Sequence, residues 1–235
     1  MNRSSIEWTD YTWNPLTGCS RLCRNSEGKI HCYAYWMAQR LKGRYGYPKD
    51  EPFKVTYHPD RLREPSQVKA PSKIFTCSMG DLFDSNSRRG WIETIFAEMK
   101  RCPQHTFQVL TQCSEPLGFF VFPENCWVGV TVKRNNEAER IRDLMKVIGY
   151  PLRFVSFEPL LEDVYADLHG LDWVIIGAQT GTTEKTFEDA WVDRLVYEAL
   201  VLEIPVFMKD NLKHHGYAGV NWFRQFPEKK EKKQR

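Results

Sequence analysis

Short, nearly continuous apolar stretches recur along the chain, and each is rich in β-branched and aromatic residues. Such stretches are typical of parallel strands that are covered on both faces. The pattern predicts seven strands, at 6–13, 73–77, 106–110, 126–130, 152–157, 173–177 and 205–208.

Helical spacing of apolar residues separates several of the predicted strands. One apolar face is formed in each of three segments, by Trp91, Ile95, Phe96 and Met99, by Ala138, Ile141, Leu144 and Met145, and by Trp191, Leu195, Ala199 and Leu200. Strand and helix in alternation indicate right-handed βαβ units and a parallel sheet. We therefore expect an α/β fold, most economically a partial TIM-like (β/α) barrel, with an open doubly wound sheet as the alternative.

A chain of 235 residues has the size that barrels and α/β folds commonly hold in one domain. We expect a single domain over 1–227, with an inserted segment of loop and short helix at about 43–72. The end of the chain, 228–235, is rich in lysine and reads as a basic, disordered tail.

Composition and termini limit the class of protein. A hydrophobic content of 42% supports a real core, and no apolar run approaches the roughly 18 residues that a membrane span needs. The first five residues have no apolar stretch of the secretory kind. We expect a cytoplasmic protein with no membrane partner, in which cysteines serve metal binding or packing rather than disulfides.

Three of the seven cysteines, Cys19, Cys23 and Cys32, lie between the first predicted strand and a helix predicted at 33–41. Three thiolates on one such loop can bind three irons of a [4Fe–4S] cluster and leave the fourth iron open for chemistry. The remaining four lack ligand spacing and are expected to be buried small apolar residues: Cys77, Cys102, Cys113 and Cys126.

Polar residues follow several predicted strands at the point where each ends, which is the edge where ligands meet parallel sheets. If the strand assignment holds, they converge on one mouth. The candidate binding residues are Ser78, Asp81, Thr131, Glu158, Gly177, Gln179 and Lys209.

Several of these candidates also have a plainer interpretation. Ser78 and Asp81 are residue types that cap the segment that follows them. Gly177 belongs to a glycine-flanked turn, which by itself is weak evidence for a ligand, and Lys209 could simply end a strand. Glu158 is harder to explain in this way, because it directly follows an apolar strand and precedes a proline.

Three N-terminal motifs resemble a known family, namely 6–10 (Ile-Glu-Trp-Thr-Asp), 13–19 (Trp-Asn-Pro-Leu-Thr-Gly-Cys) and 32–34 (Cys-Tyr-Ala). They look like the radical-SAM-like proteins of phages and prokaryotes that are usually described only as "phage protein". The similarity extends along most of the chain and includes 78–83, 106–111, 157–161, 173–177 and 207–209.

This resemblance implies a partial TIM barrel with a [4Fe–4S] cluster on Cys19, Cys23 and Cys32. S-adenosylmethionine would chelate the open iron through its amino and carboxylate groups. Its reductive cleavage, with electrons from a reductase or other donor, would give methionine and a 5′-deoxyadenosyl radical that abstracts hydrogen from a substrate.

By the same resemblance, Asp81 stands where such enzymes contact the methionine amino group, and Glu158 and Lys209 stand where cofactor or substrate contacts are made. The chain departs from the family in its cysteine spacing. It reads Cys-x3-Cys-x8-Cys, with an insertion at 24–31, where relatives usually keep the last two cysteines two residues apart.

Two alternatives remain open from the residues. A structural zinc site of the Cys3His type would use His31 with the three cysteines, in a nucleic-acid-binding protein without radical chemistry. A nucleic-acid-binding module without catalysis would draw on the tail and on Arg21, Arg24, Lys29, Arg40, Lys42 and Arg44. The net charge of +3 argues against strong steering by the whole surface, whereas the phage association and the basic residues around the cysteine loop suggest a nucleotide or nucleic-acid substrate.

Overall fold

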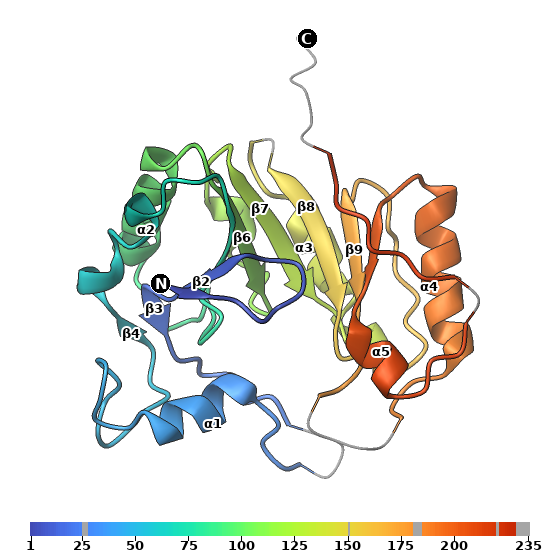
Figure 1. The fold of residues 1–235 in the computed structure, drawn as a ribbon, viewed down its shortest axis with the longest axis horizontal. Coiled ribbons are helices and arrows are strands. Elements are labelled where there is room, and N and C mark those ends of the chain that lie inside the picture. The colour runs from blue at the N-terminus through green and yellow to red at the C-terminus, as the bar shows by residue number, and fades with distance from the viewer. Residues whose placement is uncertain (25–27, 150, 181–184, 220, 229–235) are drawn as a thin grey trace, which may run out of the picture. The chain divides into compact units, whose positions relative to one another are not determined.

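The structure is a computed structural model that describes residues 1–24, 28–149, 151–180, 185–219 and 221–228. It divides into two compact units, which Figure 1 shows as ribbons. Unit 1 comprises Met1–Pro116 and Phe122–Cys126, and unit 2 comprises Leu117–Val121 and Trp127–Arg235. In the described part of the chain, no helix has both the length and the apolar composition that crossing a bilayer requires.

Unit 1 holds four strands of a mainly parallel sheet. In spatial order they are β1 (Asn2–Arg3), β2 (Tyr11–Trp13), β5 (Lys73–Thr76) and β6 (Thr106–Thr111). Strand β1 is antiparallel to β2, and the other pairs are parallel. A second, antiparallel pair joins β3 (Leu16–Thr17) to β4 (Thr56–Tyr57). The helical elements are α1 (Tyr33–Arg40), η1 (Pro59–Arg61), η2 (Pro65–Gln67) and α2 (Arg89–Arg101).

Unit 2 is built of parallel strands with helices between them. The strands lie in chain order as β7 (Cys126–Thr131), β8 (Leu152–Phe157), β9 (Trp173–Ile176) and β10 (Val206–Met208). The helical elements are η3 (Leu117–Phe119), η4 (Asn135–Glu137), α3 (Glu139–Met145), α4 (Asp189–Val201) and α5 (Asp210–His214).

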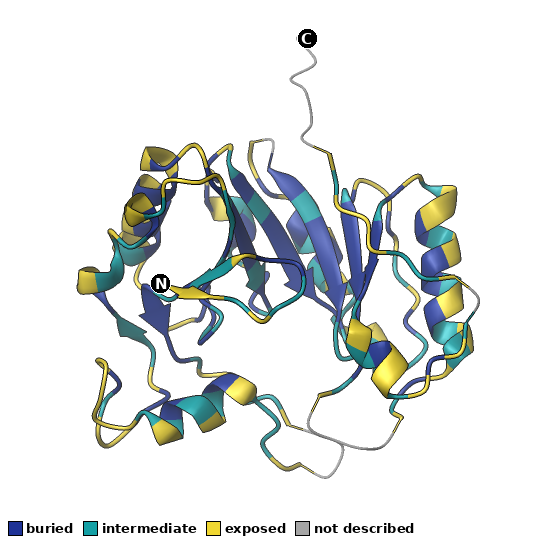
Figure 2. Ribbon diagram, in the orientation of Figure 1, coloured by how far each residue is buried: buried dark blue, intermediate teal, exposed yellow. Residues whose placement is uncertain are grey.

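Strands β6 to β10 are largely buried and are mostly dark blue in Figure 2. In unit 1 the Trp13 ring packs against the Phe107 ring at 5.6 Å, and α2 adds Phe96, whose ring lies 5.0 Å from that of Phe122. In unit 2 the fully buried Trp173 ring lies against Phe154 at 5.6 Å. Burial on both faces is why these strands read as continuous apolar runs.

The predicted α/β class with parallel strands is confirmed, and consecutive strand order within each unit is compatible with an open sheet or a partial barrel. The last six predicted strands coincide with β5 to β10 to within two residues. The predicted helices coincide with α1 to α4, and 43–72 contains only β4 and two short 3-10 turns. A single domain stays a prediction, and the tail at 229–235 lies outside the described residues.

Two predictions at element level are wrong. The first strand begins at Tyr11 and not at residue 6, because Thr9 turns the chain: its amide donates to the Ile6 carbonyl at 3.2 Å and its hydroxyl to the Lys73 carbonyl at 3.1 Å. The helical spacing predicts that Leu200 shares an apolar face with Leu195 and Ala199, yet Leu200 is 39% exposed whereas Leu195 and Ala199 are buried. The sequence does not predict strands β1, β3 and β4, of two residues each, or helix α5, of five, because each is too short to show an apolar repeat of its own.

Candidate functional site

Strands β2, β5 and β6 end side by side in unit 1, because they are parallel and paired in register. Asn14, directly after β2, links the first two ends. Its Oδ1 accepts hydrogen bonds from the Met79 amide at 2.9 Å and from the Ser78 hydroxyl at 3.2 Å. The predicted site residue Ser78 therefore lies at the strand-end edge, where it holds the loop after β5 against the start of the cysteine loop.

Two glycines let the cysteine loop lie directly against the loop after β5. Gly18 and Gly80 form a parallel bridge, and the Gly18 amide donates to the Met79 carbonyl at 2.9 Å. A Cβ on Gly18 would lie 2.3 Å from the Lys54 carbonyl oxygen, and the residue has a φ of +87°. Only glycine tolerates both conditions. The Thr-Gly-Cys motif thus brings Cys19 to the ends of the strands.

Asp81 is a buried carboxylate that ties the end of β5 to the end of β6. Its Oδ1 accepts from the Thr111 hydroxyl at 2.6 Å and from the Phe83 amide at 3.1 Å, and its Oδ2 accepts from the Gln112 amide at 2.9 Å. The bond to Phe83 is the local capping expected of Asp in this position. The Cys113 thiol is a further hydrogen-bond partner of this carboxylate.

Each thiol of the predicted cluster set receives an N–H donor. Cys19 Sγ accepts from the Arg21 amide at 3.3 Å, and Cys32 Sγ, at the N-cap of α1, accepts from the Tyr35 amide at 3.4 Å. Cys23 Sγ lies 3.2 Å from Gln112 Nε2. Hydrogen bonds to sulfur stabilise thiolates and are one means by which proteins tune iron–sulfur clusters.

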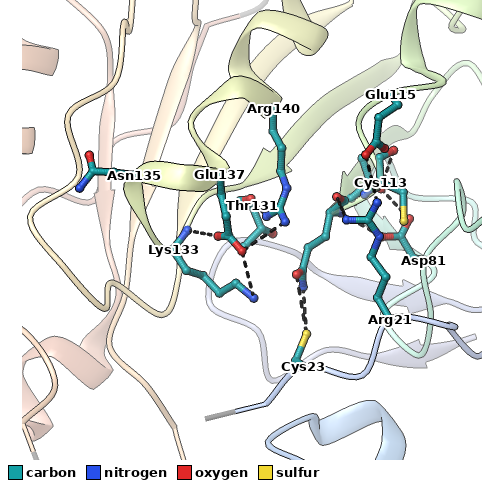
Figure 3. A network of polar contacts seen from close by, with 12 residues as sticks. Arg21, Cys23, Asp81, Cys113, Glu115, Thr131, Lys133, Asn135, Glu137 and Arg140 are labelled. Carbon is teal, nitrogen blue, oxygen red and sulfur yellow. Dashed lines mark hydrogen bonds and ion pairs between the residues drawn. The ribbon is translucent and has the colours of Figure 1, made fainter. Parts of the chain in front are cut away.

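Figure 3 shows Cys23 on its loop and, close to the end of β6, the side chains of Arg21, Asp81, Cys113 and Glu115. Arg21 pairs with Glu115 at 3.0 Å and donates to the Gln112 carbonyl at 3.3 Å. These bonds fasten the segment between Cys19 and Cys23 to the loop after β6.

The insertion between Cys23 and Cys32 closes on itself. The His31 amide donates to the Cys23 carbonyl at 2.8 Å, and Arg24 and Ile30 form an antiparallel bridge. Arg24 Nη1 also donates to the Gly28 carbonyl at 2.7 Å. The excursion therefore leaves and returns at one place, and Cys32 follows Cys23 in space although eight residues separate them in sequence.

An apolar cluster backs the cysteine loop. Its buried members are Ala34, Ala38, Tyr47, Phe53 and Met79. Both Cys19 and Cys32 pack against it. Burial, together with the nearby carboxylates Asp81 and Asp84, raises the pKa of the Cys19 thiol well above its usual value. Metal binding at Cys19 must therefore release a proton.

Three thiols on one loop are ligands of the kind that iron–sulfur clusters use. Within the described residues, no three His, Cys, Asp or Glu side chains are gathered so that they could hold one metal ion. A Cys3His zinc site needs all four ligands to converge on one tetrahedral centre. Cluster thiolates bind separate irons, so three thiols on one loop suit a cluster that keeps one iron open.

Three other predicted residues come together in unit 2. Glu158 and Lys209, which follow β8 and β10, form an ion pair in which their side chains are only 22% and 14% exposed. A Cβ on Gly177 would lie 3.0 Å from Glu158 Cδ, so this glycine lets the carboxylate lie against the backbone after β9. The Leu160 amide also donates to the Gly177 carbonyl at 3.0 Å.

The remaining predicted residues of unit 2 lie at strand ends near polar side chains that the sequence did not reveal. The buried Thr131 ends β7, and its carbonyl accepts from Arg140 Nη1 at 2.7 Å. Glu137 accepts from the Lys133 amide at 2.7 Å and pairs with Arg140 at 3.2 Å, as Figure 3 shows. Gln179 follows Ala178, whose amide donates to Asn211 Oδ1 at 3.0 Å.

Several residues of the site could have been found from the sequence. Asn14 lies inside the recognised Trp-Asn-Pro motif, and Thr111 and Gln112 end a predicted strand in the same way as the residues that were selected. Glu137, Arg140 and Asn211 carried no such signal, because they lie in helical segments after the strand ends. The four cysteines outside the loop are buried, as predicted.

Comparison with known proteins identifies a family without a known activity. The model of a family described as a protein of unknown function (DUF5131) matches residues 3–234. Neither the curated proteins nor the solved structures include one that matches the chain.

Proposed function

The chain belongs to the DUF5131 family, and we propose that it is a radical S-adenosylmethionine enzyme whose cluster ligands are Cys19, Cys23 and Cys32. The observation that carries the proposal is the closed insertion. The hydrogen bond from the His31 amide to the Cys23 carbonyl offsets the long Cys-x8-Cys spacing. All three thiols then belong to one loop against the ends of β2, β5 and β6.

Several groups of the chain support this role. The N–H donors at the three sulfurs, from Arg21, Gln112 and Tyr35, stabilise the negative charge of bound thiolates. The apolar cluster behind Cys19 and Cys32 excludes water from that side of the loop. A dry environment is what radical chemistry requires.

The binding of S-adenosylmethionine is assigned to residues at strand ends. Asp81 is a buried carboxylate close to the cysteine loop, and we assign to it the contact with the methionine amino group. Further cofactor contacts are assigned to Ser78, Thr131, Gly177 and Gln179. Glu158 and Lys209 form an ion pair, and a carboxylate or amino group of a ligand could replace one partner of that pair. When bound, the cluster supplies the electron that cleaves the sulfonium and so starts hydrogen abstraction from the substrate.

The proposal includes two partners. A reductase or other electron donor must deliver the electron, and the substrate is a nucleotide or nucleic acid, as the basic residues around the cysteine loop suggest. The competing function is a zinc-stabilised, Cys3His nucleic-acid-binding protein, in which His31 would be a ligand.

Anaerobic reconstitution with iron and sulfide tests the proposal. We expect a brown protein that absorbs at about 400 nm and, after reduction, gives the EPR signal of a cluster that changes when S-adenosylmethionine is added. With dithionite as reductant, the protein should form 5′-deoxyadenosine. Cys19→Ser, Cys23→Ser and Cys32→Ser should each lose bound iron and 5′-deoxyadenosine formation.

Matched variants separate the two candidate functions. Cys102→Ser changes a buried cysteine of unit 1 outside the loop and should keep its iron. His31→Ala should keep iron under the cluster assignment and lose metal under the zinc assignment. Protein that retains zinc alone, or a cluster spectrum that does not respond to S-adenosylmethionine, would contradict the radical enzyme.

A further inference from the structure

Helix α1 begins at the residue after Cys32 and presents an unusual exposed stripe. Tyr33, Trp36 and Arg40 are spaced three and four residues apart, so their side chains share one side of the helix. Tyr33 is 71% exposed and Trp36 54% exposed, whereas Ala34 and Ala38 are buried in the apolar cluster. Figure 2 shows that the ribbon of α1 has both exposed and buried positions.

Basic side chains continue this surface beyond the helix. Lys42 and Arg44 are exposed, and Tyr45 is 75% exposed. Between residues 28 and 49 the sequence contains five Lys and Arg residues and no Asp or Glu. A chain whose net charge is only +3 thus concentrates positive charge at this place. We call the set Tyr33, Trp36, Arg40, Lys42, Arg44 and Tyr45 the α1 face.

Local contacts hold the α1 face in position. The Trp36 indole donates to the Ile30 carbonyl at 3.3 Å, and its ring meets the Tyr35 ring edge-on with centroids 5.3 Å apart. Arg44 Nη2 donates to the Arg40 carbonyl at 2.5 Å. Since the Trp36 ring is fixed while more than half exposed, a ligand that stacks on it gains contact without first ordering the side chain.

We propose that the α1 face binds single-stranded nucleic acid, with unpaired bases stacked on Trp36 and Tyr33 and phosphates held by Arg40, Lys42 and Arg44. Aromatic rings interleaved with cations are the arrangement by which proteins bind single strands. Duplexes hide the faces of their bases, so the exposed rings favour unpaired strands. This inference rests on the proposed function in one respect: the single strand bound by the α1 face would be the substrate of the proposed radical enzyme.

Charge and helix orientation argue against other occupants. An acidic protein partner would match the cations, but the stripe has no aliphatic residue to form the apolar centre of such an interface. An anionic membrane would require the helix to insert an apolar face. The apolar side of α1, with Ala34 and Ala38, already packs within unit 1.

Fluorescence anisotropy with fluorescein-labelled oligothymidylate and oligouridylate tests the inference on the full chain. Trp36→Ala should weaken binding about tenfold, and Trp36→Phe should keep most of it, because stacking needs the ring and not the indole N–H. Arg40→Glu with Lys42→Glu should weaken binding at low salt and make the slope of log K against log salt less steep by about 1.4.

Two control variants and two control ligands accompany these measurements. Tyr197→Ala removes a tyrosine that is 69% exposed on α4, and Lys100→Glu reverses an exposed charge on α2, and both should bind as the unchanged protein does. The inference is overturned if these controls lose as much affinity, or if duplex DNA or phosphatidylserine vesicles bind as well as the single strands. Thermal unfolding of each variant identifies losses caused by misfolding.

Oligonucleotide binding and radical chemistry are measured in separate experiments. Cys19→Ser should bind the oligonucleotides with unchanged affinity, since Cys19 is not part of the α1 face. If the unchanged protein does not bind the oligonucleotides, the inference is overturned. Iron binding and 5′-deoxyadenosine formation would still support the proposed enzyme. Normal oligonucleotide binding without any bound iron contradicts the proposed enzyme and leaves the α1 face supported.

Discussion

His58 shows how a single residue far from the cysteines in sequence supports their loop. Its ring Nε2 is hydrogen-bonded to the Thr17 hydroxyl at 2.8 Å, two residues before Cys19, and its backbone amide donates to the Pro15 carbonyl at 2.8 Å. The residue is only 4% exposed. Burial, with Arg61 nearby, lowers the pKa of His58 to about 4.

This lowered pKa predicts acid sensitivity. The ring stays neutral in the folded protein, while in the unfolded chain it takes up a proton below its ordinary pKa of about 6.5. The unfolded state binds more protons, so the stability is complete above about pH 6.5 and falls by roughly 3 kcal/mol as the pH approaches about 4. Urea unfolding over this range measures the loss.

The matched variant is His58→Gln, whose amide can still hydrogen-bond to Thr17 but does not titrate. Its unfolding free energy should fall less between about pH 6.5 and pH 4 than that of the unchanged protein. The same pH dependence in both proteins would show that His58 is not the group responsible.

At the scale of elements, the closed insertion between Cys23 and Cys32 has the clearest consequence. Its ends are joined by the His31 amide and the Cys23 carbonyl, so the residues within it can change while the two cysteines stay together. Elsewhere along the chain, long apolar strands were located from their pattern. The elements that were missed, such as β3 and β4, are two-residue pairings that depend on a distant partner.

The hydrogen bond between His31 and Cys23 predicts that the insertion is dispensable for iron binding. Replacing 24–31 with Gly-Asn should give a Cys-x2-Cys spacing and preserve iron and sulfide content after anaerobic reconstitution. An eight-residue Gly/Ser replacement keeps the length but removes the closure, and its greater loop entropy should reduce the iron content. Loss of iron in the short variant, with an unchanged circular dichroism spectrum, would count against the closed insertion.

At the scale of the whole molecule, the formal charge of +3 misrepresents where the charge lies. All the charged residues of 28–49 are basic, and so are five of the seven charged residues of 228–235. The two regions make different predictions for nucleic-acid binding, because only the α1 face combines cations with exposed rings.

Deleting 228–235 removes five basic and two acidic residues and brings the formal net charge to zero. We expect the truncated protein to keep its affinity for oligothymidylate within about threefold, because stacking on the α1 face remains. Titration at several salt concentrations measures the change. A loss as large as that of Trp36→Ala would place the binding surface in the tail.

The sequence alone determined the α/β class, six of the strands and the grouping of three cysteines. These features depend on residues close together in the chain, namely the apolar runs of buried strands and the spacing within a motif. The tertiary structure alone decided that Asp81 holds Thr111 and Gln112, and that Glu158 pairs with Lys209. It also decided that the insertion closes through the hydrogen bond from the His31 amide to the Cys23 carbonyl. Such contacts join residues far apart in the chain, and only the pairing of strands and loops brings their side chains within hydrogen-bonding distance.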